Sequence, residues 1–377
     1  ADSAVTDLRA LAAPVRVAVS GAYGRYGDIS LSTTDDAFSS GSSSPGMLLA
    51  SALGTAQQRT VSDGTQFLAA LSRPSIYYDF LSPLPLSILA DLVGAELEDD
   101  TAFRRLVLSV GEDQGVRLYL WDGGASFAQC DVGLSAAQLE QAVSTYELGN
   151  AFFAFDRADQ WEDRDAVEAC SLFLEGDLPN FPTLTAVSAL TDSSSLLASM
   201  GFNPSTKFRY TESSGTEVIS DGDRTLRIRT DGTVFYQSGG DPALTIAASG
   251  EVPTIIEAAV GCTGLVSQLS SGMIGDASFY LESVQQTGNT FIIRYGLQIG
   301  GVPIRLSSNY AAEVILTGTT VSSMMLTLRQ YTASADTSLL LPLRQALAIA
   351  ALDPGRELSI GYADSGAASV SAVWLLD

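Results

Sequence analysis

The sequence predicts an α+β protein in which an N-terminal mixed α/β region precedes two similar domains, each a curled antiparallel sheet covered by a helix. Three observations lead to this prediction. Short alternating strands follow each other closely after about residue 206, a helix with an apolar face interrupts them, and the same order of elements then begins again. We therefore expect domains at 1–190, 191–288 and 289–377, the last repeating the fold of the second.

The first domain is expected to mix short strands with short helices. Its expected strands are 14–19, 75–80, 103–110, 115–122 and 125–131, and its expected helices are 62–72, 85–94 and 135–147. Ser135 and Gln138 form a capping box at the start of the last helix, and Gly94 follows the end of the second. The Ser- and Gly-rich stretch 39–46 is expected to be a loop, and 174–187, which holds two prolines, is the expected linker.

The two later domains are each expected to have the order β-β-β-β-α-β. The second domain is expected to begin with a short helix within 192–206. Its expected helix is 252–270, and its expected strands are 206–212, 216–220, 224–230, 233–238 and 278–285. In the third domain the expected helix is 339–352, and the expected strands are 290–298, 302–307, 311–316, 319–330, 357–363 and 369–375. Gly215 matches Gly301 and Gly232 matches Gly318, because 301 − 215 and 318 − 232 both give 86. This constant offset favours a duplicated unit over two unrelated hairpins. Turn geometry explains the pair formed by Gly300 and Gly301.

Composition excludes several classes of function. The 377 residues are 46% hydrophobic and 17% charged, which is enough for a sizeable core. The sequence contains 20 Lys and Arg residues and 43 Asp and Glu residues, so its net charge is −23. This charge argues against binding of nucleic acid and against electrostatic adhesion to anionic membranes. There is no histidine. Ser-His-Asp and Cys-His catalysis and histidine metal sites are therefore excluded.

The cysteines and the glycine-rich or acidic motifs point to no cofactor and no metal. Cys130, Cys170 and Cys262 form no CxxC pattern, and we expect small buried side chains, although a Cys130–Cys170 disulfide is an open alternative in an exported chain. The stretch "GAYGRYGD" (21–28) lacks a phosphate-loop pattern and is expected to be a loop between strands. "ELEDD" (96–100) and "SDGD" (220–223) lack calcium-loop spacing, and the second is expected to be a hairpin turn. Lys207 lies in an alternating stretch, where we expect it to face solvent.

Paired carboxylates are the catalytic option that needs no histidine. The candidate acids are Asp79, Asp156, Asp159, Glu162 and Asp163, and the aromatic neighbours Tyr77, Tyr78 and Trp161 would suit a sugar. A solvated acidic surface is the simpler interpretation, because acidic residues are common throughout the chain. We therefore expect no catalytic, cofactor-binding or metal-binding residues, and we cannot place a partner-binding surface from the sequence.

Several stretches resemble a known family. "FIIRYGLQIGGVPIRL" (291–306), "TGTTVSSMMLTLRQYT" (317–332) and "LLPLRQALAIA" (340–350) resemble the C-terminal half of the YycH/YycI proteins. The stretch 208–237 is similar to the preceding domain of that family, and 71–94 looks like its N-terminal segment in which a buried strand precedes a short helix. These are patterns of apolar and glycine positions, with no catalytic signature.

The resemblance implies an extracytoplasmic, membrane-anchored regulator in Gram-positive-type bacteria. Its implied partner is a membrane sensor histidine kinase of cell-wall homeostasis, or a paralogous regulator. No apolar run of this sequence reaches the roughly 18–20 residues that span a bilayer, and the sequence starts at Ala1 without Met. We therefore expect that a signal or an anchor preceded it.

Three hypotheses follow. The first is a non-enzymatic protein-binding module that regulates the kinase by contact. The second is a cell-surface protein that binds glycans, or hydrolyses them with paired carboxylates. The third is a structural protein or inhibitor of the cell envelope.

Overall fold

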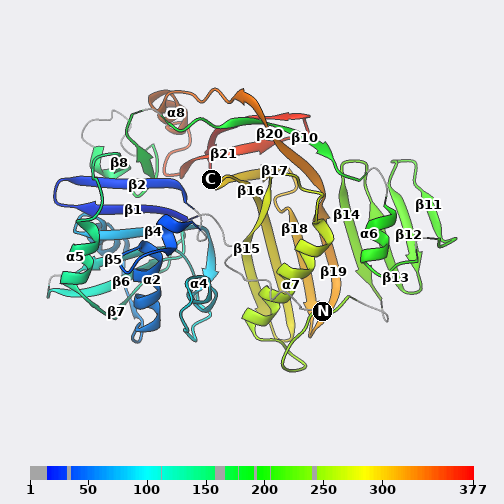
Figure 1. The fold of residues 1–377 in the computed structure, drawn as a ribbon, viewed down its shortest axis with the longest axis horizontal. Helices are drawn as coiled ribbons and strands as arrows, with labels where there is room; N and C mark the ends of the chain where they lie inside the picture. Colours follow the sequence, from blue (N-terminus) through cyan, green and yellow to red (C-terminus); the bar gives the residue numbers. More distant parts are fainter. Residues whose placement is uncertain are drawn as a thin grey trace. The chain divides into compact units, whose positions relative to one another are not determined.

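The computed structural model describes residues 15–31, 35–111, 113–157, 166–176, 178–190, 193–203, 205–239 and 244–377. These residues form two compact units. Unit 1 holds Pro182–Thr337 and Tyr362–Ser371, and unit 2 holds the described residues of Ala12–Phe181 with Ser338–Gly361 and Ala372–Asp377. Both units mix helices with antiparallel sheets (Figure 1). The predicted α+β class is confirmed at this level, with 21% helix and 44% strand.

Unit 2 is built on a nine-stranded sheet in the order β3-β7-β6-β5-β4-β1-β2-β8-β9. The strands are β1 (Val15–Gly21), β2 (Gly24–Leu31), β3 (Thr60–Val61), β4 (Ser75–Pro85), β5 (Ala102–Val110), β6 (Gly115–Trp121), β7 (Phe127–Ser135), β8 (Ala151–Phe153) and β9 (Leu172–Leu174). The pairs between them are antiparallel. The middle strands β1, β4 and β5 are almost continuously buried, because helices and loops cover both faces of the sheet.

Unit 2 contains several short helices, three of which were expected from capping and apolar patterns in the sequence. They are α1 (Asp36–Ser39), α2 (Pro45–Gly54), α3 (Gly64–Leu71), α4 (Leu86–Val93), α5 (Ala136–Val143), the 3₁₀ helix Ala154–Arg157 and α8 (Leu343–Ala350). The Ser135–Gln138 capping box of α5 is present, and Gly94 ends α4 in the left-handed region at φ 78°. The predicted helices at 62–72, 85–94 and 135–147 are therefore confirmed.

A C-terminal segment, Ser338–Gly361, returns to unit 2. It contains α8 and the first part of β21 (Leu358–Asp364), whose last residues belong to unit 1. The strand β23 (Ala372–Leu376) lies beside the first part of β21. The inner face of α8 packs against β8, β9 and the chain around Val167, which joins this segment to the N-terminal part of unit 2.

Unit 1 contains a large, mostly antiparallel sheet in the order β11-β12-β13-β14-β19-β18-β16-β17-β21, with β15 paired to β16. Its strands are β11 (Arg209–Thr211), β12 (Glu217–Asp221), β13 (Arg224–Ile228), β14 (Thr233–Ser238), β15 (Ser278–Thr287), β16 (Thr290–Ile299), β17 (Val302–Leu306), β18 (Ala312–Thr317) and β19 (Thr320–Thr327). A small sheet of β10 (Pro182–Ser188), β20 (Arg329–Thr337) and β22 (Ser369–Val370) completes the unit. The pairing of β17 with β21 is parallel.

Two helices cover one face of the large sheet. The short α6 (Ser194–Ser199) precedes β11, and the long α7 (Ile255–Ser270) packs against β15, β16 and β18 (Figure 1). A capping box formed by Thr254 and Glu257 starts α7. In the core, the hydroxyl groups of Thr263 and Tyr295 lie 3.0 Å apart, which satisfies both buried groups.

The matched glycines of the predicted duplication all lie in turns. Gly215, Gly301, Gly232 and Gly318 adopt positive φ angles between strands, as a hairpin turn requires. The strand orders of the two segments differ: β11 to β14 form a simple meander, whereas β16 lies between β17 and β18. The strands of both segments join one sheet, because β14 pairs with β19. The division into three domains and the duplication itself stay predictions.

Four elements differ from the expectation. The loop expected at 39–46 ends in α2, and the linker expected at 174–187 contains most of β10. The single strand expected at 319–330 is two strands, because β19 ends at Thr327 and β20 begins at Arg329. The glycine-rich stretch 21–28 belongs largely to the β1–β2 hairpin. A Cβ atom on Gly27 would lie 2.5 Å from the Cβ of Ala151, so glycine permits the close approach of β8.

Candidate functional site

Charged side chains meet inside unit 2. Arg16 comes from β1, Asp79 from β4, Arg104 and Arg105 from β5, and Glu357 from the residue before β21. We call these five residues the ionic cluster. Asp79 and Arg105 are each 1% exposed and Glu357 is 7% exposed, so the charges are largely removed from water. Such charges persist in a protein interior only when they are paired.

The sheet register explains how the cluster forms. Arg16 is the cross-strand partner of Asp79, and Asp79 is the cross-strand partner of Arg105. Residues directly opposite each other point to the same face of a sheet, so a carboxylate lies between two guanidinium groups. The next partner in the row is Trp121, whose ring lies 4.6 Å from the guanidinium carbon of Arg105.

Glu357 completes the charge balance. Its carboxylate lies 2.7 Å from nitrogen atoms of Arg16 and Arg104 and 3.0 Å from Arg105. Asp79 lies 2.9 Å from Arg104 and 3.6 Å from each of the other two arginines. Glu168 supplies a further ion pair to Arg105 from the chain before β9. Three arginines are thus matched by three acids, all within unit 2.

Both central acids are held ionised. Burial by itself raises the pKa of Asp79, but Arg104, Arg105 and Arg16 outweigh burial and hold that pKa well below 3.8. Burial likewise opposes ionisation of Glu357, and the same arginines lower its pKa below 4.5. A carboxylate that stays ionised near neutral pH and contacts three arginines is unsuited to general acid–base catalysis. The ionic cluster therefore has a structural role: it joins strands β1, β4 and β5 to the chain just before β21.

Two of the carboxylates that the sequence singled out, Asp79 and Asp156, lie among the described residues, and they pair with different arginines. Asp156 accepts hydrogen bonds from Arg25, at 2.5 Å and 2.7 Å, and from the backbone N–H of Phe153 at 2.8 Å. Asp79 belongs to the ionic cluster. The remaining candidates lie outside the described residues: Asp159, Trp161, Glu162 and Asp163. Tyr77 and Tyr78 are buried and offer no exposed aromatic surface.

The other singled-out motifs have structural roles. "SDGD" (220–223) forms the predicted hairpin turn between β12 and β13, with Gly222 at φ 61°. In the acidic stretch 96–100, Asp99 pairs with Arg59. Lys207 is exposed, as expected. Among the residues that the structure describes, no cluster of acids and cysteines suits a metal ion, and no helix is long and apolar enough to cross a bilayer.

The three cysteines are buried and free, so Cys130 and Cys170 do not form a disulfide. Burial raises the pKa of Cys130 to about 11 and that of Cys170 to about 12, although Arg105 lies 3.3 Å from the Cys170 sulfur. Burial also raises the pKa of Cys262. A thiol with such a raised pKa is rarely ionised at neutral pH, so these three cysteines are poor nucleophiles.

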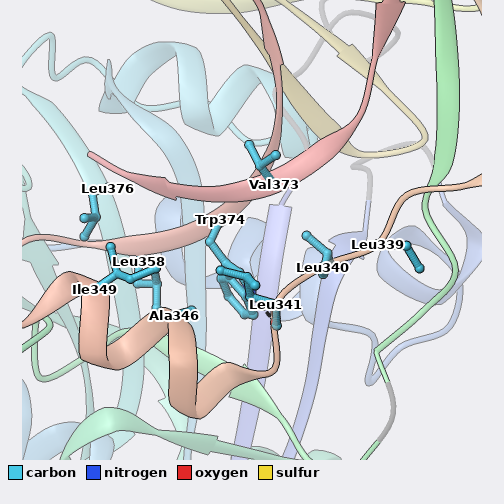
Figure 2. A pocket seen from close by; sticks show the side chains of 9 residues that line it. All are labelled: Leu339, Leu340, Leu341, Ala346, Ile349, Leu358, Val373, Trp374 and Leu376. Carbon is cyan, nitrogen blue, oxygen red and sulfur yellow. Dashed lines mark hydrogen bonds between the residues drawn. The ribbon is translucent and has the colours of Figure 1, made fainter.

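An apolar pocket of about 180 Å³ opens beside α8. We call it the α8 pocket; it is lined by Leu339, Leu340, Leu341, Ala346, Ile349, Leu358, Val373, Trp374 and Leu376 (Figure 2). Every lining residue belongs to unit 2. None of these nine side chains carries a charge, so the pocket suits an apolar group.

Short-range features of the C-terminal segment shape this pocket. Pro342 begins α8 and directs the leucine run before it along the mouth of the pocket. The indole N–H of Trp374 donates a 2.8 Å hydrogen bond to the carbonyl of Leu341, which fixes the ring in the pocket wall (Figure 2). The backbones of Glu357 and Asp377 exchange two hydrogen bonds, at 3.3 Å and 3.0 Å, and so set an antiparallel register between β21 and β23.

Several side chains at the pocket are unusually exposed for their type. Leu339 is 95% exposed and Ile349 is 50% exposed, and Leu341 and Val373 are also exposed. Neighbouring exposed apolar residues on a protein surface commonly mark an interaction surface. The sequence alone does not predict this pocket. The leucine run at 339–341 is the signal in the sequence, where its apolar pattern predicts the start of a helix instead of an exposed surface.

Comparison with known proteins adds no assignment. No family model matches the chain, and no curated protein matches it. One similar solved structure is an uncharacterized protein from Eubacterium rectale ATCC 33656, with 11% sequence identity and a TM-score of 0.34. The match covers 53% of this chain and 76% of that one.

Proposed function

We propose that this chain is a non-enzymatic protein-binding module and that the α8 pocket is its contact site for a partner protein. The observation that carries the proposal is the set of exposed apolar side chains around a pocket without charged lining residues. Burying a leucine that is otherwise exposed contributes roughly 1.5–3 kcal/mol, so covering this surface favours association.

The surroundings of the candidate carboxylates Asp79 and Asp156 favour a protein-binding function over glycan hydrolysis. Asp79 is ionised and surrounded by arginines, and Asp156 is bound by Arg25. Within the described residues, both acids are neutralised by arginines, whereas a glycosidase needs two carboxyls that face a sugar across an open cleft. Hydrolysis of a glycan by these two acids therefore finds no support in their surroundings.

The partner belongs to the proposal as an expectation from the resemblance to YycH/YycI proteins. We propose an extracytoplasmic location behind an N-terminal anchor, and a membrane sensor histidine kinase or a paralogous regulator as the partner. The repeated element order of 191–288 and 289–377 supports that resemblance at the level of sequence pattern. Regulation requires that the module bind the two states of the kinase with different affinity.

Site-specific crosslinking in cells tests this proposal. A photoreactive phenylalanine at Leu339 is expected to crosslink to the sensor kinase or the paralogous regulator. The matched control places the same group at Leu352, which is 85% exposed but does not line the pocket. Deleting the protein is expected to change kinase output. Crosslinks of equal yield from both positions, or unchanged kinase output after deletion, would contradict the proposal.

A further inference from the structure

We propose that the α8 pocket binds an extended apolar segment of the partner, which adds as a strand to the free edge of β23. This inference rests on the proposed function and specifies the mode of binding. It follows from three observations: the backbone groups at the edge of β23, the chemistry of the pocket lining and the charge of the chain.

The first observation is that β23 is an edge strand in the part of the chain that the structure describes. The paired hydrogen bonds between Glu357 and Asp377 place this pair in register. In an antiparallel pair, such bonded positions alternate with positions whose N–H and C=O groups point the other way. The backbone groups of Ala372, Trp374 and Leu376 therefore point away from β21. The N–H of Ala372 already donates a 2.9 Å hydrogen bond to the hydroxyl of Ser338, so the free edge within the described residues begins beyond Ala372, at Trp374 and Leu376.

Beyond Ala372, whose N–H is bonded to Ser338, the edge of β23 lacks the features that usually block strand addition. Proteins protect edges with charged side chains, proline or very short strands. The edge strand of the unit 1 sheet, β11, has three residues and carries Arg209. In contrast, β23 has five residues, Ala-Val-Trp-Leu-Leu, without a charge or a proline. A free, apolar strand edge specifies an extended peptide as its occupant.

The second observation is that the pocket lies on the face of β23 where such a peptide would place every second side chain. Trp374 and Leu376 point to this face, and Leu358 lies opposite Leu376 in the register set at Glu357 (Figure 2). An apolar cavity of about 150 Å³ binds benzene. A pocket of about 180 Å³ therefore has room for one leucine or phenylalanine side chain.

The third observation concerns charge. The indole N–H of Trp374 is already bonded to the carbonyl of Leu341, so the ring presents an apolar surface to the occupant. The net charge of the chain is −23. Long-range attraction therefore favours lysine or arginine on both sides of the apolar core of the peptide. The predicted occupant is an extended segment of alternating apolar residues with basic flanks.

Fluorescence anisotropy with a labelled peptide tests this mode of binding. The probe is acetylated KKVFVLVKK, compared with the same peptide carrying N-methyl groups on every second central residue. N-methylation removes the N–H donors of one edge and leaves the side chains in place. We expect the first peptide to bind and the N-methylated one to bind about tenfold or more weakly, the loss that corresponds to one or two backbone hydrogen bonds.

Protein variants locate the site on the chain. Leu339→Gln combined with Ile349→Gln is expected to weaken binding of the first peptide about tenfold, because two apolar contacts are lost. The control is Leu352→Gln, an equally exposed leucine outside the pocket, which is expected to leave affinity within about twofold. All of these side chains are at least half exposed, so the variants keep the core intact.

Each contrary outcome has a defined meaning. Equal binding of the two peptides, with loss in the double variant, would overturn strand addition and leave the pocket as the contact site. Self-association that the double variant abolishes would make a second copy of this chain the occupant and overturn the proposal. No peptide binding at all would overturn strand addition, whereas the proposed function is decided separately by the crosslink from Leu339.

Discussion

Asp79 and Glu357 contact the same three arginine side chains, although they are far apart in the sequence (357 − 79 = 278). Arg16, Arg104 and Arg105 each lie within 3.6 Å of both carboxylates. Neither acid could remain buried and ionised without these cations. The shared arginines therefore join the C-terminal segment, which carries α8, to the middle strands of unit 2.

Removing one charge from the ionic cluster should be costly. Glu357→Gln leaves guanidinium charge buried without its counter-charge, and we expect the free energy of unfolding to fall by about 3 kcal/mol. The control is Asp353→Asn, because Asp353 forms an exposed ion pair with Arg356. Its loss should cost less than about 1 kcal/mol. Urea denaturation measures both, and equal effects of the two variants would contradict the assignment.

The stabilisation by the cluster should depend on pH in one direction. Asp79 and Glu357 have lower pKa values in the folded state than the ordinary values of 3.8 and 4.5. Their contribution is therefore complete above the ordinary values and is lost as pH falls below them. We expect the difference between wild type and Glu357→Gln to shrink in urea denaturation at about pH 3 relative to about pH 7. A difference that stays constant over that range would be contrary to this mechanism.

The thiols should be unreactive in the folded protein. Cys130 and Cys170 have pKa values raised by burial to about 11 and about 12, and Cys262 is fully buried. A disulfide-exchange reagent at neutral pH is expected to label none of them until denaturant is added, and then to label all three. Rapid labelling of native protein, or fewer than three thiols after unfolding, would show that the cysteines differ from this description.

The hairpin between β16 and β17 should depend on glycine for its backbone. Gly300 has φ 56° and open space where a Cβ atom would lie, so a side chain there strains only the backbone. Gly300→Ala is expected to cost about 1 kcal/mol, and Gly300→Asn less, because asparagine tolerates the left-handed region. Gly250→Ala is the control, since Gly250 has no positive φ and no close neighbour. Thermal unfolding compares them, and equal melting temperatures for the two alanine variants would contradict the expectation.

The start of α7 should have an acid with an unusually low pKa. Glu257 accepts hydrogen bonds from the backbone N–H groups of Thr254 and Ser249, which lower its pKa to about 2. Its contribution to stability is therefore present above 4.5 and is lost as pH falls through about 2. Titration of the side-chain carboxyl by NMR checks the value. An ordinary value near 4.5 would show that the capping box does not form in solution.

Local chemistry made much of the fold predictable. The capping residues Ser135 and Gln138, the terminating Gly94 and the turn glycines 300 and 301 act over a few residues, so the sequence alone places these helix ends and turns. The glycines of 21–28 were harder to interpret. Their reason is the close approach of β8, which is distant in the sequence.

The candidate site was not predictable in the same way. The adjacent charges Arg104 and Arg105 in an otherwise apolar strand are a signal that could have indicated buried charges, but nothing near them in the sequence identifies Glu357 as their partner. The leucines 339–341 were expected to begin a helix, and only β23, which returns to this part of unit 2, provides Trp374 and Leu376 to complete the pocket.

The sequence by itself determined the α+β class, most helix and strand positions, the negative charge and the absence of histidine chemistry. These depend on composition and on interactions between neighbouring residues. Only the tertiary structure decided which arginines neutralise Asp79, that the cysteines stay unpaired, and that β23, the last strand of its sheet among the described residues, lies beside an apolar pocket. Those outcomes depend on which distant segments meet, because a buried charge or an open edge is defined by what packs against it.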